Sequence, residues 1–134
     1  MGDIKIPYVV VAQDIDYVKI NDGERKFAIV DPLINLEVDK LPSKLKTRVA
    51  FSTVGMNYGE KYTAVFFLFD PVGREIINKE QTIMCNDFDS KPVVTTFVQN
   101  AEFDIFEAGE YVFKVGIKDQ VLADYTLYIS EGVF

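Results

Sequence analysis

Carboxylates separated by one residue are the side chains of this sequence best suited to chemistry. Asp14 with Asp16, Asp87 with Asp89, and Glu102 with Asp104 have this spacing. On a strand it puts both side chains on one face, and a pair of carboxylates is what glycoside hydrolysis uses. That reaction also needs the two groups set several ångströms apart across a substrate cleft, which sequence spacing alone does not establish.

Histidine is absent from the chain. Its absence removes the commonest general base, the commonest metal ligand, and the Ser-His and Cys-His arrangements of nucleophilic catalysis. Neither a glycine-rich phosphate loop nor the motifs CxxC, HExxH or GxSxG occur. We therefore expect a protein that is not an enzyme and that uses no organic cofactor.

Calcium is the ligand that the polar residues favour most. The segment "CNDFDSK" supplies Asn86, Asp87, Asp89 and Ser90 as oxygen ligands close together in the chain. A second segment, "DIDYVKINDGE", is similar but, like the first, lacks EF-hand spacing; its polar residues are Asp14, Asp16, Asn21 and Asp22. Short acidic loops also serve turn formation and solubility. Glycan binding is the related hypothesis, since the chain has 7 tyrosines to stack on sugars but no tryptophan.

Charge and cysteine content restrict the partners and the compartment. The net charge is −7, which argues against nucleic acid, whose phosphates require a basic surface. The chain has one cysteine, Cys85, and a lone thiol forms no internal disulfide, so we expect a buried thiol in a cytoplasmic protein. The start "MGDIKIPYVVVAQD" has no basic leader, and its apolar run is too short for a membrane span.

The elements that position these residues are predicted to be strands. With 134 residues, 49% of them hydrophobic, the chain has the size and composition of one domain over 1–134. Runs of Val, Ile, Phe, Tyr and Thr recur between Gly, Pro, Asn and Asp residues, and no helical period is present. The predicted strands are 6–12, 16–20, 27–37, 46–54, 62–70, 74–84, 93–99, 110–118 and 121–130.

Reversals between these strands have recognisable turn residues. Asp22-Gly23 predicts a hairpin between the second and third strands. Pro71 with Gly73, and Asp119 with Gln120, predict two more hairpins, one joining 62–70 to 74–84 and one joining the last two strands. Pro42, in "DKLPSKLK", marks a loop that crosses between layers.

Alternation in the last two strands identifies the core. Tyr111, Phe113, Val115 and Ile117 share one face of their strand, and Ala123, Tyr125, Leu127 and Ile129 share one face of the next. Paired strands with one apolar face and one polar face form half of a sandwich. The three aromatics of "FEAGEYVFKV" are therefore predicted to be core residues rather than a ligand site.

Tyr111, placed after Ala108, Gly109 and Glu110, resembles the tyrosine corner of immunoglobulin-like sandwiches, whose hydroxyl bonds back to the preceding connection. Together with "VDPLINLEVDKLPSKLKTRVAFS" and "YTAVFFLFDPVGREI", the chain resembles a group of small bacterial immunoglobulin-like β-sandwich proteins of unknown function. The resemblance implies an all-β, antiparallel two-sheet sandwich of about eight or nine strands, in a bacterial or phage setting, and brings no chemistry with it.

The strand "YTAVFFLFD" does not alternate. Val65, Phe67 and Phe69 form a second apolar row behind Ala64, Phe66 and Leu68, and both faces need cover. Cover from within the chain is one explanation. The other is an interface, with Tyr128 beside the row, through which the protein self-associates or binds another protein. We expect such a non-enzymatic interaction or structural module; the alternative is a ligand-binding sandwich that holds calcium or a glycan at its loop ends.

Overall fold

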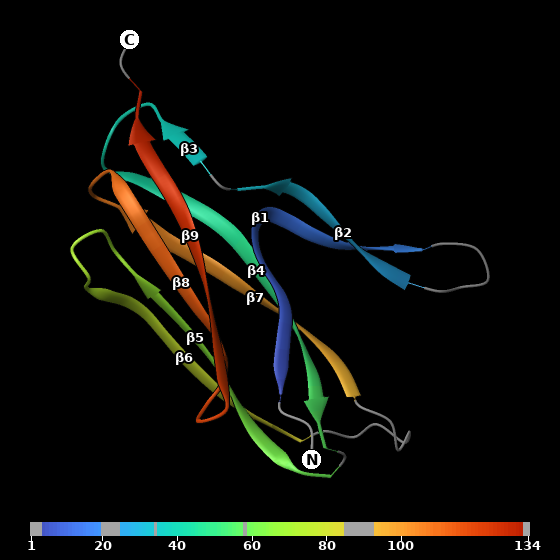
Figure 1. Cartoon of the computed structure of the whole chain (residues 1–134). Helices are drawn as coiled ribbons and strands as arrows, with labels where there is room; N and C mark the ends of the chain where they lie inside the picture. Colours follow the sequence, from blue (N-terminus) through green and yellow to red (C-terminus); the bar gives the residue numbers. More distant parts are fainter. Residues whose placement is uncertain (1–3, 20–24, 34, 58, 85–92, 133–134) are drawn as a thin grey trace.

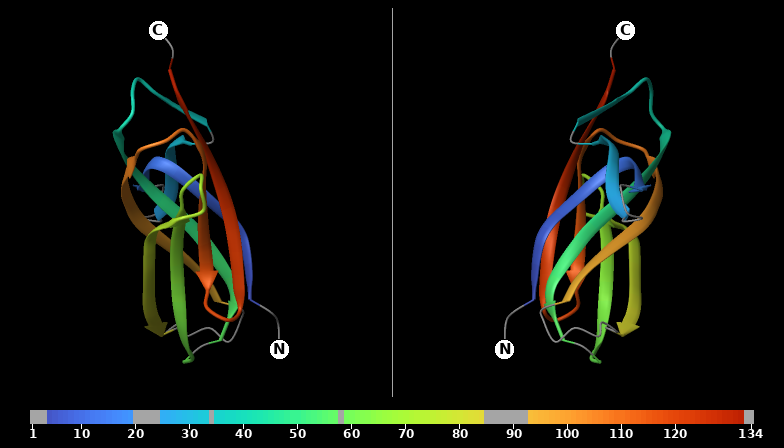
Figure 2. Two further views of the ribbon diagram at one scale, coloured as in Figure 1. Left: turned by 90° about the vertical axis from the view of Figure 1, so that its left-hand side faces the viewer. Right: turned by 90° about the vertical axis from the view of Figure 1, so that its right-hand side faces the viewer.

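Nine strands in the described part of the chain form two sheets packed face to face (Figures 1 and 2). The computed structural model describes residues 4–19, 25–33, 35–57, 59–84 and 93–132. The first sheet has the order β2 (Arg25–Pro32), β1 (Lys5–Lys19), β4 (Ser43–Met56), β7 (Val93–Ile105). The second has the order β3 (Asn35–Val38), β9 (Val121–Glu131), β8 (Gly109–Ile117), β5 (Lys61–Phe69), β6 (Glu75–Met84). The predicted all-β, two-sheet class is confirmed.

One pair of strands departs from the predicted antiparallel arrangement. β3 runs parallel to β9, with Leu36 opposite Ile129, so the second sheet is mixed. The prediction was wrong here because it came from hairpins, which join only antiparallel neighbours. β3 reaches β9 differently, since the chain leaves the first sheet at the end of β2 and enters the second at Asn35.

Several predicted strand boundaries were also wrong. The predicted strands 6–12 and 16–20 are the single strand β1, whose second half pairs with β2. The predicted strand 27–37 is two strands in different sheets. The predicted strand 93–99 continues to Ile105 as β7. Polar residues misled the prediction in β1 and β7, because paired strands tolerate them wherever a face is not needed for the core.

The three predicted hairpin pairings are confirmed. β1 pairs antiparallel with β2, β5 with β6, and β8 with β9. In the β5–β6 turn Gly73 has φ +88°, a left-handed conformation that glycine adopts at little cost. Asp119 in the β8–β9 turn has φ +64°, which aspartate tolerates better than most residues.

The core lies between the sheets and contains the residues that alternation predicted. Phe113 and Leu127 are completely buried, and Tyr111 and Val115 nearly so. Phe66 stacks on Phe113 with ring centroids 6.1 Å apart. All three aromatics of the segment 106–115 were predicted to be core residues. Tyr111 and Phe113 are buried, which confirms the prediction for them, but Phe106 is exposed on the turn that precedes β8.

The flank of the sandwich beside β2 and β3, called here the closed flank, is sealed by the chain itself. Leu33 is buried there between the sheets, and its N–H donates to the Val11 carbonyl at 2.8 Å. The Tyr125 hydroxyl donates to the Leu33 carbonyl. Residues 39–42 then carry the chain back from β3 to β4, as Pro42 predicted.

Nothing in the described ranges is a helix that could reach across a lipid bilayer.

Candidate functional site

The turn between β5 and β6 and the connection before β8 are locked together by polar contacts. The Asp70 carboxylate accepts hydrogen bonds from the Arg74 N–H at 2.8 Å and from Arg74 Nε at 2.7 Å. Arg74 Nη2 also donates to Glu107 Oε1 at 2.9 Å. Tyr111 Oη donates to the Glu107 carbonyl at 2.8 Å, so the predicted tyrosine corner is confirmed. These groups satisfy one another, which is what a structural corner requires.

Two pKa values reflect this packing. Burial of the Asp70 carboxyl raises its pKa, but the hydrogen bonds and charge of Arg74 lower it by more, so the pKa lies below the ordinary 3.8. Burial of the Tyr111 hydroxyl raises its pKa above the ordinary 10.0. Both groups are therefore held in their hydrogen-bonding forms at neutral pH.

The predicted interface row lies on the outer face of β5. Val65 is only 3% exposed, while Phe67 and Phe69 are half-buried. One long side chain of the neighbouring strand β8 reaches the row. Lys114 Nζ is 5.9 Å from the centre of the Phe69 ring.

The outer face carries a further ion pair beside Val65. Glu80 lies opposite Val65 on β6, and its carboxylate is 3.4 Å from Lys118 Nζ. Tyr128, the fourth predicted interface residue, lies on β9 and is 46% exposed. Two strands separate β9 from β6 in the sheet order, so Tyr128 is not part of the β6 edge.

The calcium hypothesis falls on residues without a described position. Asn86, Asp87, Asp89 and Ser90 lie in 85–92, and Asn21 and Asp22 lie in 20–24, both outside the described ranges. Among the residues that are described, no group of three or more Cys, Asp or Glu side chains is placed to hold a metal ion. Of the carboxylate pair Glu102 and Asp104, both exposed on β7, Glu102 pairs with Lys44 at 3.4 Å.

Among the strands whose side chains are described, β6 has the largest share of exposed residues. It forms one edge of the second sheet, and only Ile77 and Ile83 of its ten residues are partly buried. Ile76 is 39% exposed and Met84 is 49% exposed. An edge strand presents unpaired N–H and C=O groups, so β6 combines free backbone groups with exposed apolar side chains.

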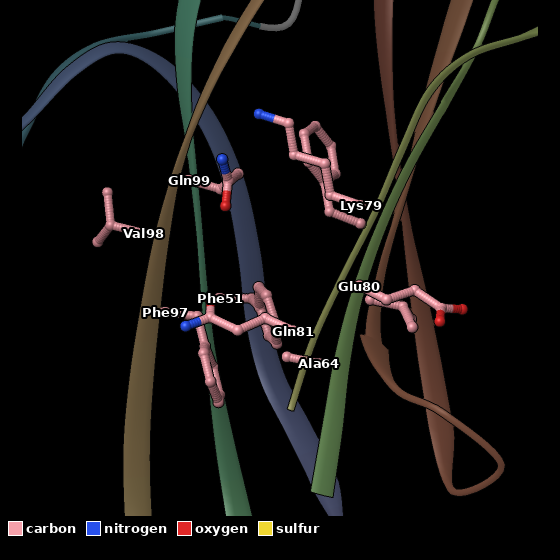
Figure 3. A pocket seen from close by; sticks show the side chains of 10 residues that line it. Phe51, Ala64, Lys79, Glu80, Gln81, Phe97, Val98 and Gln99 are labelled. Atoms are coloured by element: carbon pink, nitrogen blue, oxygen red, sulfur yellow. The ribbon is translucent and has the colours of Figure 1, made fainter. Parts of the chain in front are cut away.

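A narrow slot opens beside β6, on the flank where β6 and β7 face each other, called here the open flank. The slot has a volume of about 70 Å³. Its floor contains Phe51 and Phe97, whose rings stack with centroids 4.8 Å apart. Lys79, Gln81 and Gln99 surround the opening, and Figure 3 shows Gln81 directed toward the two rings while Glu80 points the opposite way.

A wider hollow, the corner pocket, lies near the locked turns. Its volume is about 290 Å³, and Tyr111, Phe103 and Ile77 line it together with Arg74 and Asp70. Phe106, 69% exposed, stands at its rim. The open flank thus presents two hollows and an unpaired strand edge.

The sequence carries a signal for the open flank in the polar residues of β6 and β7. β6 positions facing the core should be apolar, and Ile77 and Ile83 are, but Lys79 and Gln81 between them are polar. Gln99 interrupts β7 in the same way, between Phe97 and Ala101. Polar residues at inward positions of a strand indicate a sheet edge.

The fold and the tyrosine corner together define a small all-β sandwich consistent with the immunoglobulin-like class. No protein-family model and no curated protein matches the sequence. Among solved structures, the chain is similar to the crystal structure of the C-terminal domain of Wzt, with a TM-score of 0.61 and 14% identity over 99% of this chain and 77% of that one. At this identity the likeness shows the fold alone.

Two further similarities are weaker. One is to a β-glucosidase from Listeria innocua in complex with glucose, with a TM-score of 0.48 and 9% identity over 98% of this chain and 16% of the enzyme. The other is to the CARDB domain of the PF1109 protein from Pyrococcus furiosus in complex with di-metal ions, with a TM-score of 0.41 and 11% identity over 95% of this chain and 96% of that domain. Neither carries an argument about function.

Proposed function

We propose that the protein is a non-enzymatic interaction module that self-associates through the edge of its second sheet at β6. The observation that carries the proposal is the exposure of β6, a ten-residue edge strand on which Ile76 and Met84 are both open to solvent. Natural sandwiches usually protect such an edge with inward charges or bulges, and β6 has an inward Lys79 and a register shift at Ile76, yet its two apolar side chains at Ile76 and Met84 stay exposed. Addition of another strand would satisfy the backbone groups and bury the apolar side chains in one step.

The β6 edge is a better candidate for the binding surface than the outer face of β5. Val65 is already buried, Phe67 and Phe69 are half-buried, and Lys114 Nζ lies over the Phe69 ring. On the β6 edge, Ile76 and Met84 are exposed. An edge contact also matches the expectation, drawn from the sequence, of self-association on a sheet face or edge.

The experiment is light scattering coupled to size-exclusion chromatography over a concentration series, with and without calcium. We expect a dimer that becomes monomeric in Ile76→Lys/Met84→Lys, because the added charges repel a second strand. Phe67→Glu/Phe69→Glu is the control for the sheet face. A wild-type monomer at every concentration would refute self-association, and a change only with calcium would favour the ligand-binding alternative.

Circular dichroism melts of both double variants separate loss of association from loss of folding. The edge variant should keep a cooperative melt, since its substituted side chains are exposed. If instead the face variant alone becomes monomeric while staying folded, the binding surface is the outer face of β5 and the edge proposal is wrong.

A further inference from the structure

The order of apolar and polar residues along β6 is the same in both directions of the strand. The segment "IINKEQTIM", residues 76–84, places two apolar residues, two polar residues, Glu80, two polar residues and two apolar residues in order. Such symmetry is not needed for pairing with β5, since β5 has no matching symmetry. It is what a strand needs when its partner is another copy of itself.

We infer that two copies of the chain pair their β6 strands antiparallel, with the two-fold axis passing through Glu80, so that the second sheet continues across the dimer. The inference rests on the proposed function and adds the register. In this register Ile77 lies opposite the partner subunit's Ile83, and Lys79 lies opposite the partner subunit's Gln81. The two apolar residues of β6 that face the core then meet apolar residues, while Ile76 lies at a register shift at the end of this regular stretch.

Symmetry restricts the registers to choose from. A two-fold axis between antiparallel strands stands perpendicular to the sheet, so each residue faces a residue on the same side of the sheet. The axis must therefore pass between the two copies of one residue, such as Lys79, Glu80 or Gln81, so that this residue lies opposite itself. Shifting it from Glu80 to Lys79 would oppose Ile77 to the partner subunit's Gln81, and shifting it to Gln81 would oppose Lys79 to the partner subunit's Ile83.

Lys79 selects among these registers. It faces inward beside Phe66 on β5 and lies at the mouth of the slot. An inward charge on an edge strand normally discourages pairing, because it would meet an apolar or like-charged residue. With the axis at Lys79, this lysine lies opposite the partner subunit's Lys79, which has the same charge. Only with the axis at Glu80 does it meet a neutral polar residue, the partner subunit's Gln81.

Two Glu80 side chains meet at the proposed axis on the outer face, and like charges directly opposite each other weaken a pair of strands. Each Glu80 has Lys118 of its own chain at 3.4 Å, which offsets part of this repulsion. A second copy is favoured over an unrelated peptide as the occupant of the edge because the same register pairs Ile77 with the partner subunit's Ile83 and Lys79 with the partner subunit's Gln81 on both strands.

Single cysteines test the register in a Cys85→Ser background, so that each variant carries one thiol. Directly opposed residues in antiparallel strands have Cα atoms about 4.5–5.5 Å apart, within disulfide range, whereas diagonal neighbours are about 7–8 Å apart. We expect Glu80→Cys to form a disulfide-linked dimer under mild oxidation. Lys79→Cys and Gln81→Cys should each stay unlinked alone and become linked to each other when the two are mixed.

The outcomes distinguish the register from the proposed function. A wild-type dimer with Lys79→Cys or Gln81→Cys linking to itself, or with Glu80→Cys unlinked, overturns the register and leaves self-association standing. A wild-type monomer removes both. Glu80→Gln gives a second readout: removing the opposed carboxylates should tighten the dimer about 2- to 5-fold, and a weakened dimer would contradict an axis at Glu80.

Discussion

The two flanks of the sandwich differ in what fills them. At the closed flank the chain itself passes between the sheets, Leu33 is buried, and the Tyr125 hydroxyl fastens the crossing segment. At the open flank β6 and β7 face each other across a slot ringed by Lys79, Gln81 and Gln99. The closed flank is sealed by the chain itself, whereas the open flank ends in an edge strand with exposed apolar side chains.

The largest expected effect comes from truncating the closed flank. Leu33→Ala should lower the free energy of unfolding by about 3 kcal/mol, because it leaves a cavity between the sheets. Ile77→Ala is the matched change on the open flank, where the side chain is only half-buried, and it should cost about 1 kcal/mol. Urea denaturation of both variants measures the difference, and equal losses would erase the distinction between the flanks.

A smaller effect is expected from the two tyrosines that bond to backbone carbonyls, one near each flank. Tyr111→Phe and Tyr125→Phe each remove one hydroxyl donor, which should cost about 1 kcal/mol. Burial raises the pKa of both hydroxyls above 10.0, so the unfolded chain loses these protons first as the pH rises. The stability should therefore fall above about pH 10 in the wild type and fall less in each variant.

Melts at neutral and alkaline pH compare these tyrosines with Tyr128→Phe, an exposed control. A loss of stability in Tyr128→Phe as large as in Tyr111→Phe and Tyr125→Phe would show that the two hydroxyl bonds contribute nothing specific.

The smallest effect is expected at the locked turn beside the corner pocket. Since the Asp70 pKa is lowered below 3.8 in the folded chain, its stabilising contribution is present above that pH and is lost as the pH falls through the folded value. Arg74 is largely exposed, so solvent weakens the contribution. In Asp70→Asn the melting temperature should change less between about pH 4 and about pH 2 than it does in the wild type. In the control Glu75→Gln it should change with pH as in the wild type.

Much of the fold could be predicted from the sequence because its strands alternate and its turns carry diagnostic residues. Tyr111 and Phe113 were placed in the core by alternation, and Gly73 and Asp119 located turns. The parallel β3–β9 pair was missed because only Pro32 marks the place where the chain changes sheets, and a proline ends a strand without indicating where the next one pairs.

The candidate site was predicted less well than the fold. The sequence favours Val65, Phe67 and Phe69 as an interface because β5 is apolar on both faces. The edge at β6 was missed because its signal is the reverse, polar Lys79 and Gln81 at positions that should be apolar. Whether a strand lies at an edge depends on sheet order, which distant residues determine.

The parallel pair also has a consequence for synthesis. Leu41 N–H donates to the Glu131 carboxylate although the two residues are 90 positions apart in the chain. Within the described part of the second sheet, β3 pairs only with β9. A ribosome making about 5–20 residues per second therefore releases β3 several seconds before its neighbour exists. During that interval the second sheet can grow only from β5, β6 and then β8, and contacts so distant in sequence favour slow folding.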